Sequence, residues 1–462
     1  MNSKYRKDRD SLGEIEVPEN AYYGAFTSRA MKQYKINLLP PHQQLIKSFV
    51  LVKKAAALAN KDLKVLDETI ADAITKACDD ILDGKYLENF VIETMNSGAG
   101  TAFNMNCNEV IANIALEKLG KPKGSYDVIS PNDHVNMSQS SNDTSPTSMH
   151  LAILLNCNDV LKSLEILINS LENKSKEFDD VIKIGRTHLM DALPVTLGSE
   201  FESYHYSLSK AKDEIEHSLS NLYFIALGGT AVGSGANTPK GYKELVVNYL
   251  SQISGLPLKN SPNLFYSLQS KFDVIACSSS IKNLAIELSK MANDFRLMAS
   301  GPIAGYSEIL IPAVHAGSSI MPGKVNPSLA ECLNMICFNV MGNDMSISLA
   351  SQAGQFELNV MLGVMLKCML DSTDMLKNFL PIFARNMVDG LAANKEKLES
   401  YVHKSPVLVT LLNPVIGYLK AAEVYKESIA SDRTIKEIVL EKGLMSESEL
   451  DKALSREKIL NG

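Results

Sequence analysis

The chain has 462 residues, of which 45% are hydrophobic and 21% are charged. These values are close to those of an average soluble globular protein and disfavour long disordered tracts, collagen-like repeats or a coiled coil alone. The 46 Lys and Arg residues against 53 Asp and Glu give a net charge of −7 without a basic stripe, which argues against nucleic-acid binding. No apolar run is long enough to span a membrane and residues 1–10 contain no apolar signal segment, so we expect a cytoplasmic protein.

The cysteines and histidines show neither a disulfide pattern nor a metal-binding pattern. The seven cysteines are an odd number without a C-x-x-C pair, which predicts reduced thiols buried in the core. The eight histidines are scattered, and none belongs to an H-E-x-x-H or zinc-finger motif. We therefore expect no metal site and no metal cofactor.

Helical periodicity dominates the chain. The spacing of apolar residues predicts a helix that is capped by Asp67 and ends just before Gly84. Residues 265–300 contain no Gly or Pro and carry an apolar seam in steps of three and four, which predicts one long helix. Pro381 should interrupt or kink the last long helix. The other long helices are expected over about 147–179, 197–223, 329–349 and 359–380.

The long helices should form a central bundle, with a smaller part before it and another after it in the sequence. We expect an all-α fold with an N-terminal domain over residues 1–140, a helical-bundle domain over 141–393 and a C-terminal helical domain over 394–462. Helices longer than about 25 residues carry more apolar surface than one small domain buries. Part of that surface should pack on other copies of the chain, so a homo-oligomer is expected.

Four polar clusters rich in Gly or Ser interrupt the apolar periodicity, and most of them stand just before a helix. Small residues with free backbone N–H groups ahead of a helix form a concavity that binds anions. Asn326 as N-cap and Pro327 as the first helical residue would point the positive end of a helix, beside Lys324, into the last cluster. The clusters are residues 97–101, 138–143, 185–188 and 317–327.

Each cluster also has a simpler interpretation. Residues 97–101 could be a plain turn, and residues 138–143 could merely cap the next helix, with Pro146 near its first turn. His188 could be a structural histidine, and residues 317–327 could be a flexible surface loop. Taken together, the clusters supply many neutral donors, one cation and one histidine, a set that suits a small dianion.

A dicarboxylate held by such donors becomes more acidic at the carbon next to one of its carboxylates. The same donors stabilise the more highly charged intermediate that proton loss produces. The chemistry indicated is β-elimination. A serine of the Gly317-Ser318-Ser319 sequence could act as the base only if backbone N–H groups and Lys324 stabilised its alkoxide.

Residues 317–327, Gly-Ser-Ser-Ile-Met-Pro-Gly-Lys-Val-Asn-Pro, resemble the G-S-S-x-M-P-x-K-x-N-P signature of the aspartase/fumarase superfamily of lyases. Residues 98–101, 140–143 and 185–188 resemble the other three active-site segments of that family, in the same order along the chain. The similarity extends from residues 18–24 to the C-terminal domain. It implies a three-domain, almost all-helical subunit, a homotetramer, and active sites that combine segments of three different subunits.

The same resemblance implies a role for each site residue and requires no cofactor. Ser318 would take the Cβ proton of the substrate, and Glu331 would orient and charge His188. One substrate carboxylate would be bound by Lys324 and Asn326. The other would be held by Thr101, Ser140, Ser141 and Ser319, and the leaving-group end would be contacted by Asn142, Thr187 and His188.

Within this family the segments divide between two reactions. Residues 98–101, 130–134, 353–361 and 412–414 resemble aspartate ammonia-lyases, whereas residues 140–143 and 227–230 resemble class II fumarate hydratases. Exchanging Ser141 for Thr would add one methyl group, worth only about 1 kcal/mol, so this position alone does not select the substrate.

The resemblance leaves three functions in order of preference. The first is elimination of ammonia from L-aspartate to give fumarate, and the second is reversible dehydration of L-malate to fumarate. The third is a structural or binding member of the family that has lost activity. Its intact set of site residues argues against the third, since an inactive copy has no reason to keep Ser318, Lys324, Asn326 and His188.

Overall fold

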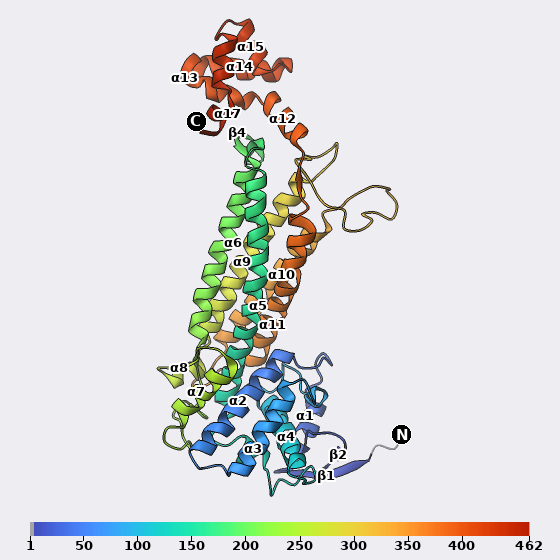
Figure 1. The fold of residues 1–462 in the computed structure, drawn as a ribbon, viewed down its shortest axis with the longest axis vertical. Coiled ribbons are helices and arrows are strands. Elements are labelled where there is room, and N and C mark those ends of the chain that lie inside the picture. Colours follow the sequence, from blue (N-terminus) through green and yellow to red (C-terminus); the bar gives the residue numbers. More distant parts are fainter. Residues whose placement is uncertain (1–3, 462) are drawn as a thin grey trace. The chain divides into compact units, whose positions relative to one another are not determined.

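The computed structural model describes residues 4–461, and most of them are helical, as expected. They divide into two compact units. Unit 1 comprises residues 4–161, 213–283 and 338–376, and unit 2 comprises residues 162–212, 284–337 and 377–461. Five long helices each continue from one unit into the other (Figure 1): α5 (Ser141–Glu177), α6 (Leu197–Leu222), α9 (Phe272–Met298), α10 (Ser328–Gln352) and α11 (Leu362–Phe383).

Unit 1 contains the N-terminal part of the chain. Strands β1 (Tyr5–Asp10) and β2 (Gly13–Pro18) form an antiparallel hairpin. Helix α2 (Gln43–Asp62) packs against both α3 (Glu68–Leu82) and α7 (Tyr242–Ser254). Asp67 caps α3 by accepting hydrogen bonds from two backbone N–H groups, and Gly84 follows the helix with a φ of 91°, as the sequence predicted. The helices are α1 (Ala25–Gln33), α2 (Gln43–Asp62), α3 (Glu68–Leu82), α4 (Thr101–Lys118), α7 (Tyr242–Ser254) and α8 (Leu264–Gln269). The shorter elements are β5 (Phe224–Ile225), which pairs in parallel with β6 (Lys259–Asn260), a 3₁₀ turn (Leu87–Asn89) and a π-helical turn (Pro131–Val135).

Unit 2 contains the other ends of the five long helices and the C-terminal helices. Strands β3 (Ile182–Thr187) and β4 (Met190–Thr196) form an antiparallel hairpin, and β7 (Ile309–Leu310) pairs with β8 (Ala392–Ala393). A π-helical turn (Ala384–Val388) follows α11, and a 3₁₀ helix (Pro406–Leu412) follows α12 (Lys395–Lys404). The helices after β8 are α12 (Lys395–Lys404), α13 (Asn413–Ile416), α14 (Tyr418–Ser431), α15 (Ile435–Glu441), α16 (Glu447–Ala453) and α17 (Arg456–Asn461).

The long helices pack on one another within each unit. In unit 1 the Asn156 amide of α5 donates to the Thr373 hydroxyl of α11 over 2.6 Å, and Ser278 of α9 donates to Asp344 of α10. In unit 2 the buried rings of Phe201, Phe295 and Phe383 stack between α6, α9 and α11.

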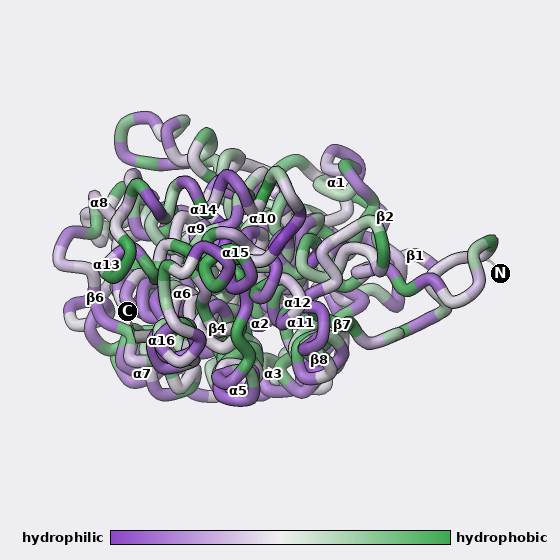
Figure 2. Tube along the Cα trace, turned by 90° about the horizontal axis from the view of Figure 1, so that it is seen from above, coloured by the Kyte–Doolittle hydropathy of each residue, from purple (hydrophilic) through white to green (hydrophobic). Residues whose placement is uncertain are grey.

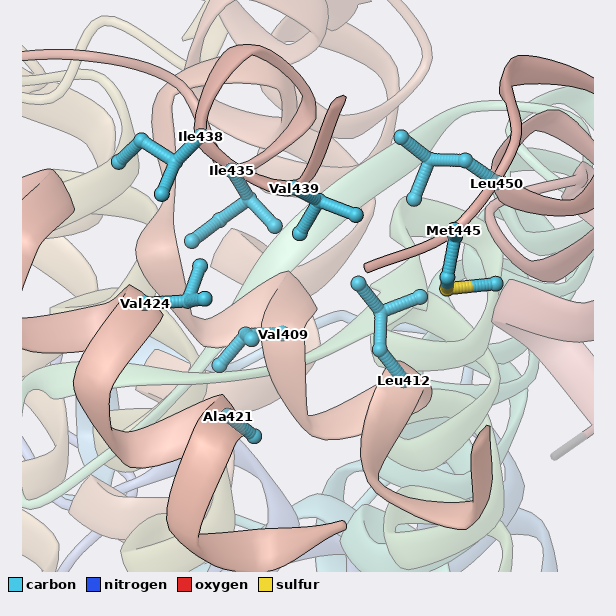
Figure 3. Packing of buried hydrophobic residues seen from close by; sticks show 9 residues of the cluster. All are labelled: Val409, Leu412, Ala421, Val424, Ile435, Ile438, Val439, Met445 and Leu450. Carbon is cyan, nitrogen blue, oxygen red and sulfur yellow. The ribbon is translucent and has the colours of Figure 1, made fainter. Parts of the chain in front are cut away.

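The C-terminal helices have a hydrophobic core of their own. Figure 3 shows that side chains from the 3₁₀ helix, α14, α15 and α16 point toward one another. The cluster consists of Val409, Leu412, Ala421, Val424, Ile435, Ile438, Val439, Met445 and Leu450. A separate core favours an independently packed C-terminal part, while the division into three domains at residues 140 and 393 stays a prediction.

Two of the predicted helix boundaries are wrong. Residues 265–300 are not one helix, because α8 ends at Gln269 and α9 starts at Phe272. Between them the buried Lys271 ammonium donates to three backbone carbonyls at the end of α8, which satisfies that end without Gly or Pro. Likewise, α5 starts at Ser141, so that Pro146 is its sixth residue. Side-chain hydrogen bonds of Ser140 and Asp143 hold the turn ahead of the proline.

Two further helix boundaries, both near prolines, differ from expectation by a few residues. Helix α11 is not interrupted at Pro381 but continues to Phe383, whose ring is buried against Phe295. Helix α10 starts at Ser328, one residue later than the position expected from Pro327. The Asn326 amide donates to the carbonyl of Gly317 over 2.5 Å, so it closes the loop that precedes the helix.

Hydrophilic and hydrophobic residues alternate along the chain, as the hydropathy colours of Figure 2 show. Within residues 4–461, no helix combines the length and the apolar character that a membrane crossing requires.

Candidate functional site

The first part of the site lies in unit 1, where two helices begin side by side. Thr101 is the first residue of α4 and Ser141 is the first residue of α5, and their hydroxyl oxygens are 3.0 Å apart. We call the three hydroxyl residues Thr101, Ser140 and Ser141, together with the adjacent amide of Asn142, the hydroxyl cluster. All four side chains are half-buried. The positive ends of two helix dipoles favour a negative charge here. The structure therefore brings four predicted residues together in a place suited to a carboxylate.

The carboxylate of Asp143 fixes the backbone next to the hydroxyl cluster. This fully buried carboxylate accepts hydrogen bonds from the backbone N–H groups of Ser140 at 2.9 Å and of Gly228 and Thr230 at 3.0 Å each. Burial raises the pKa of Asp143 from 3.8 to about 6, and the three N–H donors oppose that rise. The Asn142 amide donates to Ala231 in the same turn over 2.8 Å. Residues 140–143 and 227–230 are thus joined into one rigid pair of segments.

A second pair of segments packs around Gly98 and Ala99. A side chain at Gly98 would meet the backbone oxygen and the Cβ of Val360 at 2.7 Å, so only glycine allows this approach. Asn359, next to Val360, donates to the carbonyls of Ala350 and Ser351 and fixes its own segment to the end of α10. Residues 98–101 and 353–361 are therefore in direct contact.

The loop of residues 317–327, in unit 2, holds the predicted base. The Ser318 hydroxyl oxygen accepts hydrogen bonds from the backbone N–H groups of Met321 at 2.9 Å and Ile320 at 3.3 Å. These donors are the kind that an alkoxide at Ser318 requires. The loop closes tightly, since a Cβ on Gly317 would be 1.8 Å from the carbonyl oxygen of Lys324.

Lys324 and Asn326 line a cavity of about 370 Å³ beside this loop. The Lys324 ammonium is exposed and, among residues 4–461, has no side-chain partner, so it is available to an anion. Arg296 and Ser300 at the end of α9 line the same cavity. Ser319 is exposed on the loop. This part of the site presents a cation and polar groups to solvent.

Thr187 and His188 lie at the tip of the β3–β4 hairpin in unit 2. His188 and Leu189 both have positive φ angles, 55° and 62°, which non-glycine residues rarely adopt. Both side chains are exposed. Positive φ at both residues is the geometry of a tight two-residue hairpin turn, which here presents the histidine to solvent.

The base of that hairpin is held by ion pairs. Glu308, fully buried, accepts from Lys183 at 2.6 Å and from Arg186 at 2.6 Å, and the Arg186 guanidinium lies over the Tyr306 ring. Glu308 belongs to none of the four polar clusters, so no sequence signal pointed to it. The sequence interpretation therefore missed both this carboxylate and Asp143, which it quoted without a role.

The predicted pairing of His188 with Glu331 stays a prediction. Within the part of the chain that the structure describes, neither side chain makes a hydrogen bond or an ion pair. Both are exposed. The resemblance implies a site made by several subunits, in which different chains would supply these two residues.

The cysteines and potential metal ligands bear on the cofactor question. All seven cysteines are free; six are buried and Cys332 is half-buried. Among the described residues, no three His, Cys, Asp or Glu side chains gather closely enough to hold a metal ion.

Comparison with known proteins identifies the family. A lyase family model matches residues 13–342, and a model of the fumarase C C-terminus matches residues 408–461. This chain belongs to the fumarate lyase superfamily. The family assignment that the sequence motifs suggested is confirmed.

Relatives of this fumarate lyase carry two different names. An aspartate ammonia-lyase of a Bacillus species is 44% identical over 98% of this chain and 97% of its own length. A class II fumarate hydratase of Thermosynechococcus vestitus is 43% identical over 100% of this chain and 99% of its own. Overall identity therefore does not separate the two reactions.

Solved structures confirm the fold of this fumarate lyase. A fumarate lyase:delta crystallin from Brucella melitensis, bound to cobalt, has a TM-score of 0.95 and 43% identity over 98% of both chains. A class II fumarase from Schistosoma mansoni has a TM-score of 0.94 and 36% identity, also over 98% of both chains. The predicted all-α fold of this family is correct over nearly the full length.

Proposed function

We propose that this fumarate lyase is an aspartate ammonia-lyase, which converts L-aspartate to fumarate and ammonia. The observation that carries the proposal is the direct packing of Gly98 on Val360. It joins residues 98–101 and 353–361, both of which resemble aspartate ammonia-lyases, into one structural pair. A pair that packs together is harder to acquire by chance than a single residue such as Ala99.

In the proposed reaction Ser318 removes the Cβ proton. Loss of that proton adds negative charge to the neighbouring carboxylate, so donors aimed at this carboxylate lower the barrier. Lys324 and Asn326 bind one carboxylate, and the remaining donors hold the rest of the substrate. The second carboxylate is held by Thr101, Ser140, Ser141 and Ser319, and the amino group leaves beside Asn142, Thr187 and His188, with Glu331 orienting the histidine.

We propose that each active site is assembled from several chains of a homotetramer. Ser141 begins α5 and Thr187 follows its far end, and at 1.5 Å per residue the 37 residues of this helix span about 55 Å. A small dicarboxylate cannot reach both ends of one such helix. The family resemblance implies the same arrangement, since it combines segments of three different subunits in one site.

Helix α10 carries an exposed apolar surface that such an assembly would bury. Met335, Phe338, Met345 and Leu349 are between 56% and 63% exposed and repeat with the spacing of one helix face. Gly342 lies on the same face and leaves room for a close approach, because a Cβ there would touch nothing. We assign this apolar stripe to contact with another copy of the chain.

Class II fumarate hydratase is the second candidate. The observation that favours it is the Asp143 carboxylate, which joins residues 140–143 to residues 227–230, the two segments that resemble hydratases. The molecule thus contains one pair of contacting segments that resembles aspartate ammonia-lyases and one pair that resembles hydratases.

The deciding experiment is an ultraviolet assay of fumarate formation by the purified protein, run in parallel on L-aspartate and L-malate. We expect turnover of aspartate and not of malate. Turnover of malate alone would replace the proposal with fumarate hydratase. No turnover of either, by a correctly folded protein, would favour another substrate or a non-catalytic member of the family.

A further inference from the structure

Lys53 of α2 is a completely buried lysine close to the hydroxyl cluster. Its side chain is 0% exposed, which is rare for a lysine unless it is paired. The ammonium donates to three side-chain amide oxygens: Asn104 at 2.6 Å, Asn136 at 2.9 Å and Gln139 at 3.0 Å. We call these four residues the lysine cage. All three N–H groups of the ammonium are satisfied.

The cage leaves the charge of Lys53 without a directly bound carboxylate. Its three partners are neutral amides. The titratable groups that face it are the Asp143 carboxylate of α5 and the thiols of Cys107 in α4 and Cys78 in α3. Asp143 is itself occupied by three backbone N–H donors. A buried charge that is only hydrogen-bonded is costly and needs a reason.

The cage is connected directly to the residues of the hydroxyl cluster. Asn104 lies three residues after Thr101 in the first turn of α4, and Gln139 immediately precedes Ser140. Asn104 and Asn136 are hydrogen-bonded to each other over 3.2 Å. The beginning of α4 and the approach to α5 are therefore tied to one ammonium.

We propose that Lys53 is a positioning residue for substrate binding: its cage fixes Thr101, Ser140 and Ser141, and its buried charge favours the carboxylate that they hold. The proposal rests on the proposed function, because it concerns the same anion-binding site. Lys53 acts through the hydroxyl cluster and through its charge. Loss of the charge should weaken binding of the dicarboxylate more than it slows the chemical step.

The protonation of Lys53 gives this role a pH signature. Burial lowers the pKa of the ammonium from 10.5 to about 8, although Cys107, Asp143 and Cys78 oppose the shift. Below that pH the ammonium is charged and makes three hydrogen bonds. Above it, the neutral amine donates only two, and the attraction to the substrate carboxylate is lost. KM should therefore rise as the pH increases through about 8.

The test compares Lys53→Met with Lys54→Met. Lys54 is the next residue of the same helix, and it is ion-paired with Asp79 away from the cage. At neutral pH we expect Lys53→Met to raise KM about tenfold with a smaller change in kcat, the cost of one charged hydrogen-bonded group. Lys54→Met should leave both constants near those of the unmodified protein.

A second variant neutralises the net charge of the cage and keeps the lysine. Asn136→Asp keeps the size of the side chain and places a carboxylate on the ammonium. KM should then rise at neutral pH, and the alkaline increase in KM should move to higher pH because the pair raises the pKa of Lys53. This variant decides the question if Lys53→Met fails to fold or assemble.

The outcomes separate this inference from the proposed function. Turnover of aspartate or malate by the unmodified protein tests the function. If it turns over neither, calorimetric binding of fumarate replaces KM as the readout. Weaker binding in Lys53→Met and Asn136→Asp, but not in Lys54→Met, supports the inference. An unchanged KM and an unchanged pH profile in the two cage variants, or an equal change in Lys54→Met, would overturn it.

Discussion

The proposed reaction assigns the role of base to Ser318, whose hydroxyl is hydrogen-bonded by its own loop. Two backbone N–H groups donate to its oxygen, and the loop adds the charge of Lys324. In the proposed reaction such donors would stabilise the negative charge that develops on the serine oxygen. The backbone of the loop thus supplies part of what a stronger base would otherwise provide.

Ser318→Ala should abolish turnover without altering assembly. General base catalysis accounts for factors of about 10² to 10⁴, so kcat for fumarate formation should fall by at least about a hundredfold. Ser431→Ala, an exposed serine at the end of α14, is the control and should keep full activity. A Ser318→Ala protein with near-normal kcat would rule out the assigned base.

At the scale of elements, the 317–327 loop depends on the absence of a side chain at Gly317. A Cβ there would overlap the Lys324 carbonyl oxygen at 1.8 Å. Gly317→Ala should therefore force the loop open and lower kcat/KM by about tenfold or more, by misplacing Ser318 and Lys324. Ser431→Ala, at the exposed end of α14, is the control, because that side chain lies outside the site and outside the apolar stripe of α10. Equal activity of the two variants would contradict a closed catalytic loop.

The junction of α8 and α9 predicts a pH-dependent stability. Burial lowers the pKa of Lys271 from 10.5 to about 7 against the attraction of Asp273, and the ammonium also faces the buried His150. Between about pH 7 and pH 10.5, the unfolded state therefore binds more protons at Lys271 than the native state does. The free energy of unfolding should rise with pH across that window.

Lys271→Met should make this rise smaller by the share of one proton, while Lys53, whose pKa is also lowered by burial, keeps its own share. Urea unfolding at a series of pH values and one fixed protein concentration measures the slope. The exposed Lys240→Met is the control and should keep the slope of the unmodified protein. Identical slopes in Lys271→Met and in the unmodified protein would show that Lys271 does not cause it.

The ends of α3 and the junction of α8 and α9 show which helix boundaries a sequence pattern predicts and which it does not. Asp67 and Gly84 were predicted correctly because caps depend on a few neighbouring residues. The break at Lys271 was missed because its cause is a buried ammonium that replaces the usual Gly or Pro signal. Secondary structure follows from sequence where its cause is local, and not where it is tertiary.

At the scale of the whole molecule, the site residues divide in a similar way. The hydroxyl cluster was predicted from motifs, and the structure brings its members together. Lys53, Asp143 and Glu308 carry no motif role, because each acts through contacts with segments distant in the sequence. A lysine inside the apolar run of α2 was the one available signal for Lys53.

Mixing two inactive variants tests whether sites are shared between chains. Ser318→Ala and His188→Ala should each be inactive alone, and hybrids formed by subunit exchange should regain activity. With equal, random mixing, about a quarter of the sites receive both intact residues, if two different chains supply them. Absence of rescue after exchange verified by mass spectrometry would indicate that one chain builds the whole site.

The contact between Gly98 and Val360, and the bonds from Asp143 to Gly228 and Thr230, also bear on how such enzymes diverge. Each contact ties together two segments that lie far apart in the gene. A change of chemistry by one substitution at a time would pass through mismatched intermediates. Recombination between the two kinds of enzyme should therefore yield working chimaeras most often when the crossover points exchange both members of a pair together.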